Sequence, residues 1–312
     1  MATFKTYAQS NKREQLEDAI YRIDPEETPI LTLAKKNGVT AENTKYEWNV
    51  STLQAARDDN ALAEGANYGD ANPNLVTRMG NHTQIFHTTI DITKSAARQK
   101  TAGPKEWSRQ TSEKAAELKL DMEKTIVSNK PSSAGNATTG ARQLAGLESI
   151  ISTNVNMGAT GVTGGWNGSI FAAPTDGTPR ALTENILKAN IQQIWAAGGT
   201  PSKLFVPAAQ KVVISGFSGG ATKYQEVDAK RLTAAVDFYV SDFGTHEIIP
   251  HRLMRTRTVL NLDPKHIKLA VYRSMETVDQ PSQGDYERKV LVTEATLVVN
   301  NEKACGKISD LS

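Results

Sequence analysis

Alternating apolar and polar residues predict two β-strands in the first third of the chain, residues 44–54 and 83–93. Every second side chain of such a strand faces the same side of a sheet. The more apolar face consists of Tyr46, Trp48 and Val50 in the first strand and of Phe86, Thr88, Ile90 and Ile92 in the second. The 28 residues between the strands, 55–82, contain few large apolar side chains.

These two strands are expected to pair as a long hairpin. Eleven residues per strand would reach about 36 Å at roughly 3.3 Å per residue. An isolated hairpin is only marginally stable in water, and so long a loop is unusual inside a compact domain. The hairpin is therefore expected to lie against another molecule, which is the first indication that the chain assembles.

Helical periodicity is strongest in residues 105–129, just after Pro104. Apolar side chains recur there every three or four residues, and Lys, Glu and Asp cover the other faces. The apolar stripe consists of Trp107, Thr111, Ala115, Leu118, Met122 and Ile126. At about 1.5 Å per residue the helix would be roughly 37 Å long, which predicts a structural strut.

Two shorter amphipathic segments precede the first strand. Residues 12–23 predict a helix that ends at Asp24-Pro25, because a residue before proline disfavours the helical conformation. Its apolar side consists of Leu16, Ala19, Ile20 and Ile23. The sequence ETPILTLAKKNG predicts a second helical turn closed by Gly38. Both are too short to bury much surface alone, so they predict an arm that packs on something else.

The second half of the chain has the pattern of a globular α+β domain. A helix is predicted over 182–199, with Leu187, Ile191, Ile194 and Trp195 facing inward. A buried strand at 203–206 and a helix after Pro207 follow. Further strands are predicted at 235–243, 246–254, 258–263 and 266–273, with 275–285 as a turn-rich gap and 288–300 as a strand pair or one bent strand. Helices beside a mostly antiparallel sheet make the predicted fold class α+β.

Residues 130–181 are dominated by Gly, Ser, Thr and Asn, and only 144–151 is strongly apolar. The stretch GATGVTGGWNG, 158–168, has none of the glycine spacings of a phosphate-binding loop. A flexible surface loop is the favoured interpretation.

Asp242-Phe243-Gly244 is the tripeptide with which protein kinases hold magnesium. A kinase also needs a His-Arg-Asp catalytic loop and an Ala-Pro-Glu motif, and the sequence has neither. The tripeptide ends an alternating strand in which Val236, Phe238 and Val240 share one face. We therefore expect Gly244 to mark a hairpin turn.

His246 and His251 suggest a metal site, but Glu247 is the only further ligand nearby, and the sequence has no His-Glu-x-x-His motif. The remaining histidines, His82, His87 and His266, are scattered. The polar residues of this hairpin are expected to face solvent or a sister subunit. His251, Arg252, Arg255 and Arg257 form a basic cluster that would suit either phosphate or, as the favoured interpretation, a solvated or subunit-pairing face.

Composition excludes several classes of protein. The formal net charge is +2, from 36 Lys and Arg against 34 Asp and Glu, so charge alone does not predict nucleic-acid binding. The single cysteine, Cys305, excludes an intramolecular disulfide and fits a reducing cytoplasm; we expect a small buried residue rather than a nucleophile. No apolar run approaches the roughly 20 residues of a membrane helix, and the start lacks the pattern of a signal peptide. No metal, cofactor or catalytic residue is predicted, so an enzyme is not expected.

The order of these segments resembles the tailed-phage major capsid proteins of the Hong Kong 97 type, whose fold encapsulins share. IYRIDPEETPILTLAKK is similar to the N-terminal arm of that family, and YEWNVSTL, AEGANY and MGNHTQIF to its extended loop. AELKLDMEKTIV resembles the spine helix. NIQQIWAAGGTPSKLFVPAAQKVVISGF and VSDFGTHEIIPHRLM resemble the apical domain, and VTEATLVVNNEKACGKI the closing strand of the peripheral domain.

The resemblance implies four parts. Residues 1–43 would be an arm on a neighbouring copy and 44–94 the extended two-stranded loop; 95–130 with 284–312 would form the peripheral domain, and 131–283 the apical domain. It implies a shell of hexamers and pentamers around double-stranded DNA, bound without sequence specificity, together with portal, scaffolding and decoration proteins. The chain would be found in the virion capsid, and in the host cytoplasm during assembly. The expected subunit-interface residues are Trp48, Phe86, Ile90, Ile92, Arg252 and Arg255.

Two departures from the family pattern limit this inference. Some members cross-link loop lysines to asparagines of neighbours, but residues 46–93 contain no lysine, and only Lys45 and Lys94 flank them. About 43 residues precede the loop, too few for a fused scaffolding domain, so a separate scaffold or none is expected. An encapsulin-type cellular shell and an enzyme of unrecognised class, acting through His246, His251 or Asp242, remain the alternatives.

Overall fold

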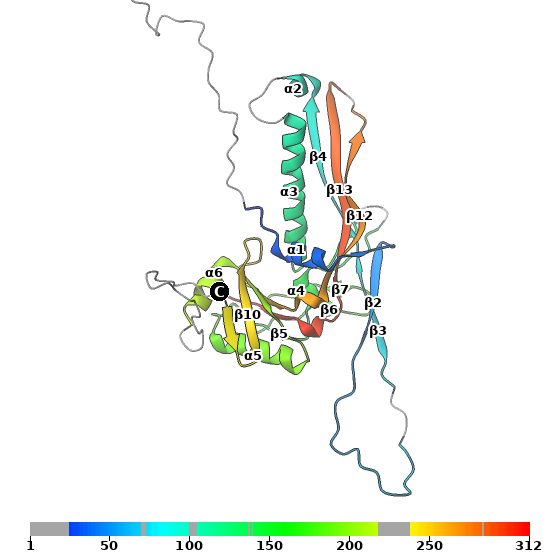
Figure 1. Cartoon of the computed structure of the whole chain (residues 1–312), viewed down its shortest axis with the longest axis vertical. Helices are drawn as coiled ribbons and strands as arrows, with labels where there is room; N and C mark the ends of the chain where they lie inside the picture. The colour runs from blue at the N-terminus through cyan, green and yellow to red at the C-terminus, as the bar shows by residue number, and fades with distance from the viewer. Residues whose placement is uncertain are drawn as a thin grey trace, which may run out of the picture.

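The computed structural model describes residues 25–69, 73–99, 105–136, 138, 140–217, 238–282 and 284–312. A long helix beside a four-stranded sheet forms one end, a six-stranded sheet with short helices forms another, and a two-stranded arm projects away from both (Figure 1). This mixture of helices with mainly antiparallel strands confirms the predicted α+β class. The predicted helix at 12–23 lies outside the described residues.

The long helix α3, Glu106–Ile126, confirms the predicted strut. It covers one face of a sheet with the strand order β1-β12-β13-β4 (Figure 1). The bounds of these strands are Val39–Thr40 for β1, Ile267–Gln280 for β12, Tyr286–Val299 for β13 and Gln84–Thr93 for β4. Strands β12, β13 and β4 are antiparallel, and β1 runs parallel to β12. The short helix α2, Lys94–Arg98, joins β4 to the segment before α3.

The predicted hairpin between 44–54 and 83–93 is wrong in its pairing. Strand β2, Lys45–Ser51, pairs with β3, Val76–His82, whereas β4 pairs along its length with β13. The alternation of apolar residues determined which face of β4 is buried but not which strand lies beside it. The apolar face of β4 is buried because α3 covers it, so the projecting arm consists of β2, β3 and the loop 52–75.

Residues 275–280, predicted as part of a turn-rich gap, continue strand β12. Its side chains beyond Arg273 are exposed, so the apolar pattern that marks a strand is absent there. Of the segment 288–300, all but the last residue lies within one strand, β13, so the alternative of one strand rather than a strand pair holds.

The second sheet has the strand order β5-β14-β11-β8-β10-β9. Its strands are β5 Val155–Asn156, β14 Gly306–Ile308, β11 Val259–Leu262, β8 Lys203–Val206, β10 Gly244–Pro250 and β9 Phe238–Ser241. Helices α5, Glu184–Ala196, and α6, Ala208–Ser215, confirm the helices predicted before and after β8. Strand β13 belongs to the first sheet and β14 to the second. Residues 284–312 therefore connect the two sheets and do not belong to one sheet alone.

Trp195, predicted to face inward from this domain, points outward. Trp195 of α5 is 55% exposed, and Asn190 is buried on the helix face where Leu187, Ile191 and Ile194 pack. In β9, Tyr239 is fully buried, whereas Phe238 and Val240 are exposed. Tyr239 lies opposite His246, which is also buried. The inner face of this edge strand is therefore the one with the Tyr239 side chain, and not the more apolar face with Phe238 and Val240.

The glycine-rich segment, residues 130–181, contacts the C-terminal residues, although much of 158–168, predicted as a flexible surface loop, lies at the surface. Its elements are α4 Leu147–Ile150, β6 Gly165–Trp166 and β7 Phe171–Ala172. The amides of Gly158 and Gly177 donate to the buried Asp310 carboxylate at 3.0 and 2.8 Å. A Cβ atom on Gly158 would lie 2.1 Å from Thr178 O, so the close approach of two backbones explains the glycine.

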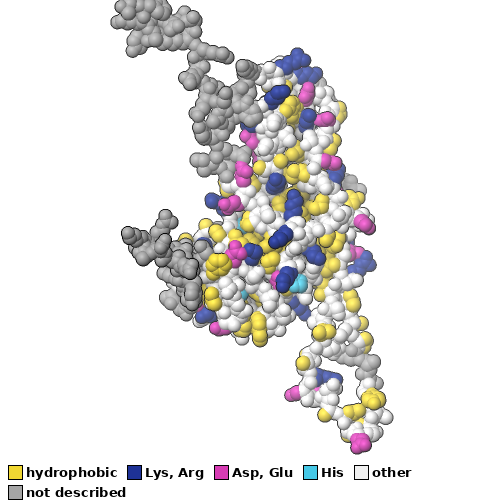
Figure 2. Space-filling model, viewed as in Figure 1, with side chains coloured by type: hydrophobic (Ala, Val, Ile, Leu, Met, Phe, Trp, Pro, Cys, Tyr) yellow, Lys and Arg dark blue, Asp and Glu magenta, His cyan; other side chains and the backbone are white. Residues whose placement is uncertain are grey.

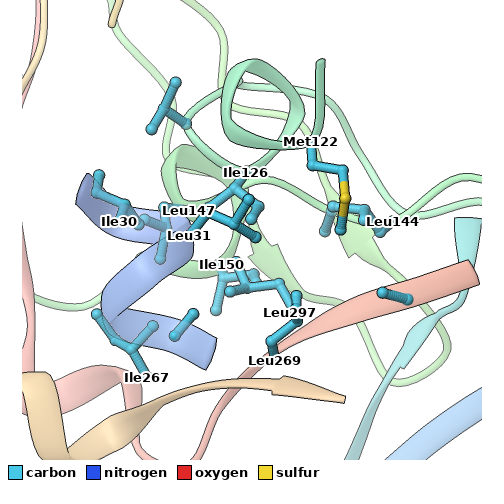
Figure 3. Packing of buried hydrophobic residues seen from close by; sticks show 14 of the residues in the cluster. Ile30, Leu31, Met122, Ile126, Leu144, Leu147, Ile150, Ile267, Leu269 and Leu297 are labelled. Atoms are coloured by element: carbon cyan, nitrogen blue, oxygen red, sulfur yellow. The ribbon is translucent and has the colours of Figure 1, made fainter. Parts of the chain in front are cut away.

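Helix α1, Pro29–Lys36, inserts its apolar side chains into the main core (Figure 3). Ile30, Leu31 and Ala34 are buried there beside side chains from α3, α4 and the four-stranded sheet. This part of the predicted arm therefore packs on its own chain. Short 3₁₀ turns at Pro264–His266 and Glu302–Ala304 precede β12 and β14.

Candidate assembly surfaces and buried polar sites

The most exposed apolar side chains lie on the projecting arm, where β2 and β3 continue into the loop 52–75 (Figures 1 and 2). Leu53, Tyr68 and Leu75 are 83%, 93% and 81% exposed, and Leu62 is also exposed. Burying one such side chain stabilises a contact by about 1.5–3 kcal/mol. An exposed apolar loop of this kind marks an interaction surface.

The base of the arm is held by its own chain. The ring of Trp48 stacks on Phe171 with centroids 6.1 Å apart. Asn81 donates to Leu297 O at 2.9 Å and accepts from the amide of Ala145 at 2.9 Å. Trp48, predicted at a subunit interface, is therefore partly buried in an intrachain contact.

Phe86, Ile90 and Ile92 were also predicted at a subunit interface, and the structure places all three in the core. They face α3 because β4 is a strand of the four-stranded sheet and not of the projecting arm. Their side chains are used within one chain and are not available to a neighbouring copy.

The predicted basic cluster separates into two environments. Arg252 is exposed, with Glu27 at 4.0 Å. Arg255 binds the buried Glu148 at 2.9 Å and also pairs with Asp176, so its guanidinium is occupied within the chain. Arg257 pairs with Asp176 at 3.7 Å. Of the predicted basic cluster, Arg252 is thus the side chain that stays exposed to a partner.

Glu148 and Lys307 form a buried charged site beneath this cluster. The Lys307 ammonium donates to Glu148 O at 2.5 Å. Burial raises the pKa of the Glu148 carboxyl, although Arg255 and Lys307 oppose the shift. Burial lowers the pKa of the Lys307 ammonium to about 8, with Glu148 opposing. Sequence reasoning missed this site because Lys307 lies in a short strand near the chain end, where a lysine is ordinarily exposed.

Lys307 predicts a pH dependence of stability. The Lys307 pKa is about 8 in the folded chain against 10.5 for a free lysine. Between pH 8 and 10.5 the unfolded chain binds more protons than the folded chain. The free energy of unfolding therefore rises with pH in this range, and this gain in stability disappears as the pH falls toward 8. A Lys307→Met variant should lack this rise, which is on the order of 2–3 kcal/mol. Denaturant unfolding at pH 8, 9 and 10 measures it.

The matched control for this titration is Lys188→Met on α5, because the Lys188 side chain is largely exposed and pairs with Glu184. That variant should keep the parent slope. A Lys307→Met variant with the same slope as the parent would contradict the assignment.

His246 is buried and does not face solvent, which corrects the expectation for this hairpin. Its Nδ1–H donates to Pro201 O at 2.7 Å, and its Nε2 lies 2.8 Å from Ser241 Oγ. Burial lowers the pKa of the His246 imidazole. The Asp242-Phe243 pair forms the turn between β9 and β10, and Gly244 has φ 138°, which confirms the predicted hairpin.

His251 is buried as well and forms a hydrogen bond with helix α3. Its Nδ1 accepts from the amides of Leu253 and Met254 at 3.2 and 3.1 Å, so Nε2 carries the proton and donates to Glu123 Oε1 at 2.6 Å. The two histidines therefore have separate hydrogen-bond partners. Among the described residues, no three His, Cys, Asp or Glu side chains are grouped to hold a metal ion.

The fully buried Glu123 carboxylate joins three elements. Besides His251, it accepts from the amides of Ile30 at 2.9 Å and Leu31 at 2.6 Å, at the first turn of α1. A carboxylate at a helix N-terminus satisfies amides that have no partner within the helix. Helix α3, helix α1 and the segment after β10 are thus tied together. Sequence reasoning placed Glu123 on a solvated helix face, and its lysine neighbours gave no contrary signal.

Cys305 is fully buried, as predicted, and burial raises the pKa of its thiol to about 12. A thiol with so high a pKa is a poor nucleophile. In the described part of the chain, no helix is both long and apolar enough to cross a membrane.

The model of the SU10 major capsid protein family matches residues 2–312. The chain belongs to this family. The major capsid protein of Escherichia phage Phieco32 is 21% identical over 343 residues, covering 97% of this chain and 95% of that protein. The family membership confirms the resemblance to phage capsid proteins and makes this chain a major capsid protein, a structural component of the virion.

Solved structures share the fold. The capsid of cyanophage A-1(L) aligns with a TM-score of 0.67 at 14% identity, covering 98% of each chain. The capsid of the native GTA particle gives 0.64 at 9% identity, again over 98% of each chain. The SrpI encapsulin of Synechococcus elongatus gives 0.58 at 9% identity, over 100% of this chain and 97% of that one. At these identities the likeness shows the capsid fold alone.

Proposed function

We propose that copies of this chain assemble as hexamers and pentamers into the closed shell of a tailed bacteriophage, and that the shell encloses double-stranded DNA. The observation that carries the proposal is the projecting arm, whose loop exposes Leu53, Leu62, Tyr68 and Leu75. Covering these side chains would stabilise a contact between copies by several kcal/mol. A contact between two different surfaces of one chain repeats around rotational axes and closes into rings.

The parts of the chain are assigned roles in this shell. The arm β2–β3 with its loop reaches a neighbouring copy, and α3 with the four-stranded sheet forms the peripheral region. Residues 131–283 contribute most of the apical region, to which β14 adds a strand. Because α1 packs on its own chain, contact with a neighbour is assigned to the residues before it and to Arg252.

The proposed partners are a portal protein, decoration proteins and a separate scaffold, with assembly in the host cytoplasm. Expression of the full chain followed by negative-stain electron microscopy tests the proposal. Capsomers or closed particles are expected, alone or with phage partners. Subunits that stay monomeric under every condition would overturn it.

The encapsulin fold makes a cellular shell the second candidate. Its physical basis is the same, but the shell would enclose a protein. The contents of native particles distinguish the two, because a phage shell would contain genome-length DNA and an encapsulin would contain an enzyme.

The assembled shell is expected to lack covalent cross-links at the loop. Isopeptide bonds need a lysine amine, and residues 46–93 contain none. Denaturing gel electrophoresis of assembled particles should therefore show a single monomer band. A ladder of bands above the monomer would contradict this prediction, and boiling in reductant controls for incomplete dissociation.

A further inference from the structure

The sequence contains two Asn-Gly pairs, Asn37-Gly38 and Asn167-Gly168. Such a pair can modify itself, because the amide nitrogen of the glycine can attack the side-chain carbonyl carbon of the asparagine. Glycine favours this attack because it has no Cβ atom to hinder the approach. The fold decides which pair reacts, since the attacking amide must be free and the asparagine side chain must be held in place beside it.

The pair Asn37-Gly38 is held in a way that blocks the reaction. The amide of Gly38 donates to Lys35 O at 3.0 Å, at the end of α1. The side-chain nitrogen Nδ2 of Asn37 donates to Pro264 O at 2.7 Å and to Ile267 O at 3.3 Å. The attacking nitrogen and the leaving nitrogen are thus both engaged in hydrogen bonds, and a hydrogen-bonded amide loses its proton slowly. The fold therefore protects this pair.

The pair Asn167-Gly168 has the opposite arrangement, in the exposed turn between β6 and β7. Asn167 Oδ1 accepts from the amides of Ser169 at 3.0 Å and Ile170 at 2.9 Å. In the described part of the chain, neither the Gly168 amide nor Asn167 Nδ2 forms a hydrogen bond. Two amides on one carbonyl oxygen stabilise the negative charge that develops there during the attack, as in an oxyanion hole. Gly168 has φ 98°, and a Cβ atom on it would contact nothing within 4 Å, so no neighbouring group shields it.

We propose that Asn167 is a site of spontaneous deamidation, where the folded chain converts its own asparagine into aspartate and isoaspartate. Hydroxide removes the amide proton of Gly168, the nitrogen bonds to Cγ of Asn167, and the Cγ–Nδ2 bond breaks. Nδ2 takes a proton from water and leaves as ammonia, which yields a cyclic succinimide. Water then opens the ring at Cγ to give aspartate, or at the main-chain carbonyl carbon to give isoaspartate. The net reaction consumes one water and releases one ammonia.

The modification would alter the base of the projecting arm. The turn 167–170 joins Trp166 to Phe171, whose rings meet edge to face with centroids 5.2 Å apart. Phe171 in turn stacks on Trp48 of the arm (Figure 1). Both products add a negative charge to this turn, and isoaspartate also lengthens its main chain by a methylene group. Unassembled subunits are therefore expected to lose assembly competence as they deamidate. This consequence rests on the proposed function, whereas the deamidation itself does not.

Incubation of the unassembled full-length chain at pH 8.5 and 37 °C, followed by peptide mass spectrometry, tests the proposal. Asn167 should deamidate at least about tenfold faster than Asn37, because the turn assists one pair and hydrogen bonds protect the other. In urea that unfolds the chain, the two pairs should react at similar rates. The proposal is overturned if Asn167 reacts no faster than Asn37 in the folded chain. It is also overturned if the difference persists in urea, because local sequence would then be its cause.

A matched variant is Asn167→Ser, whose hydroxyl can accept from the same amides but has no carbonyl carbon to attack. Electron microscopy of fresh and incubated samples should show that the parent loses particle yield with its Asn167 and that the variant does not. An incubated parent that is fully deamidated and assembles like the fresh one would contradict the consequence for the arm. A fresh parent that forms no particles would count against the proposed function, and the mass spectra would still decide the deamidation.

Discussion

A Glu123→Ala substitution is expected to lower the free energy of unfolding by about 3–5 kcal/mol, because it leaves buried hydrogen-bond donors without an acceptor. Those donors are the amides of Ile30 and Leu31 and the imidazole of His251. Water cannot replace the carboxylate where it is fully buried. Denaturant unfolding of unassembled subunits measures the loss.

The local signature of this substitution is in α1. Amide hydrogen exchange at Ile30 and Leu31 should accelerate far more than exchange in the six-stranded sheet, because α1 loses its link to α3. The control is Glu117→Ala on the same helix, where Glu117 is exposed and pairs with Lys114 at 2.6 Å. A surface pair of this kind contributes under about 1 kcal/mol. Equal destabilisation by both substitutions would show that helix propensity, not the buried carboxylate, is responsible.

Replacing residues 53–74 by Asn-Gly is expected to abolish particle formation while leaving the subunit folded. The described residues of this loop are exposed and belong to no buried hydrophobic cluster, so thermal unfolding should shift by no more than a few degrees. Ser51 already pairs with Val76, and Asn-Gly favours the two-residue turn that extends this hairpin by one pair. Sedimentation and electron microscopy measure assembly.

The reason for the loss is the apolar surface of the loop. Leu53, Leu62 and Tyr68 would together contribute roughly 5–9 kcal/mol to each contact if fully buried. A double variant, Leu62→Ala with Tyr68→Ala, should reduce particle yield without the length change. A loop-shortened chain that assembles as efficiently as the parent would contradict the proposed role of the arm.

Element types were predictable because they depend on local periodicity. The stripe in α3, with Leu118, Met122 and Ile126 at four-residue spacing, is the buried face that the structure shows. Alternation in β4 likewise identified Phe86, Ile90 and Ile92 as one buried face. These patterns follow from geometry within one element and need no knowledge of the partner.

Which strands pair and which side chains contact each other within the chain was not predictable in the same way. The sequence predicted that β4 pairs with β2, but α3 covers the apolar face of β4 and β13 takes its edge. Trp195 was expected inside, yet Asn190 is buried because its side chain donates to Asn154 O at 3.1 Å and accepts from Asn261 at 2.6 Å. A buried polar residue is stable only with such partners, and they lie far along the chain.

The sequence by itself determined the α+β class, the strut helix, the hairpin near Gly244 and the resemblance that the family match confirms, because each rests on residues close together along the chain. Only the tertiary structure decided that His251 and Glu123 meet and that Asp310 holds the glycine-rich segment. These features join residues more than 100 positions apart, and their energies depend on burial and distance, which no local pattern encodes.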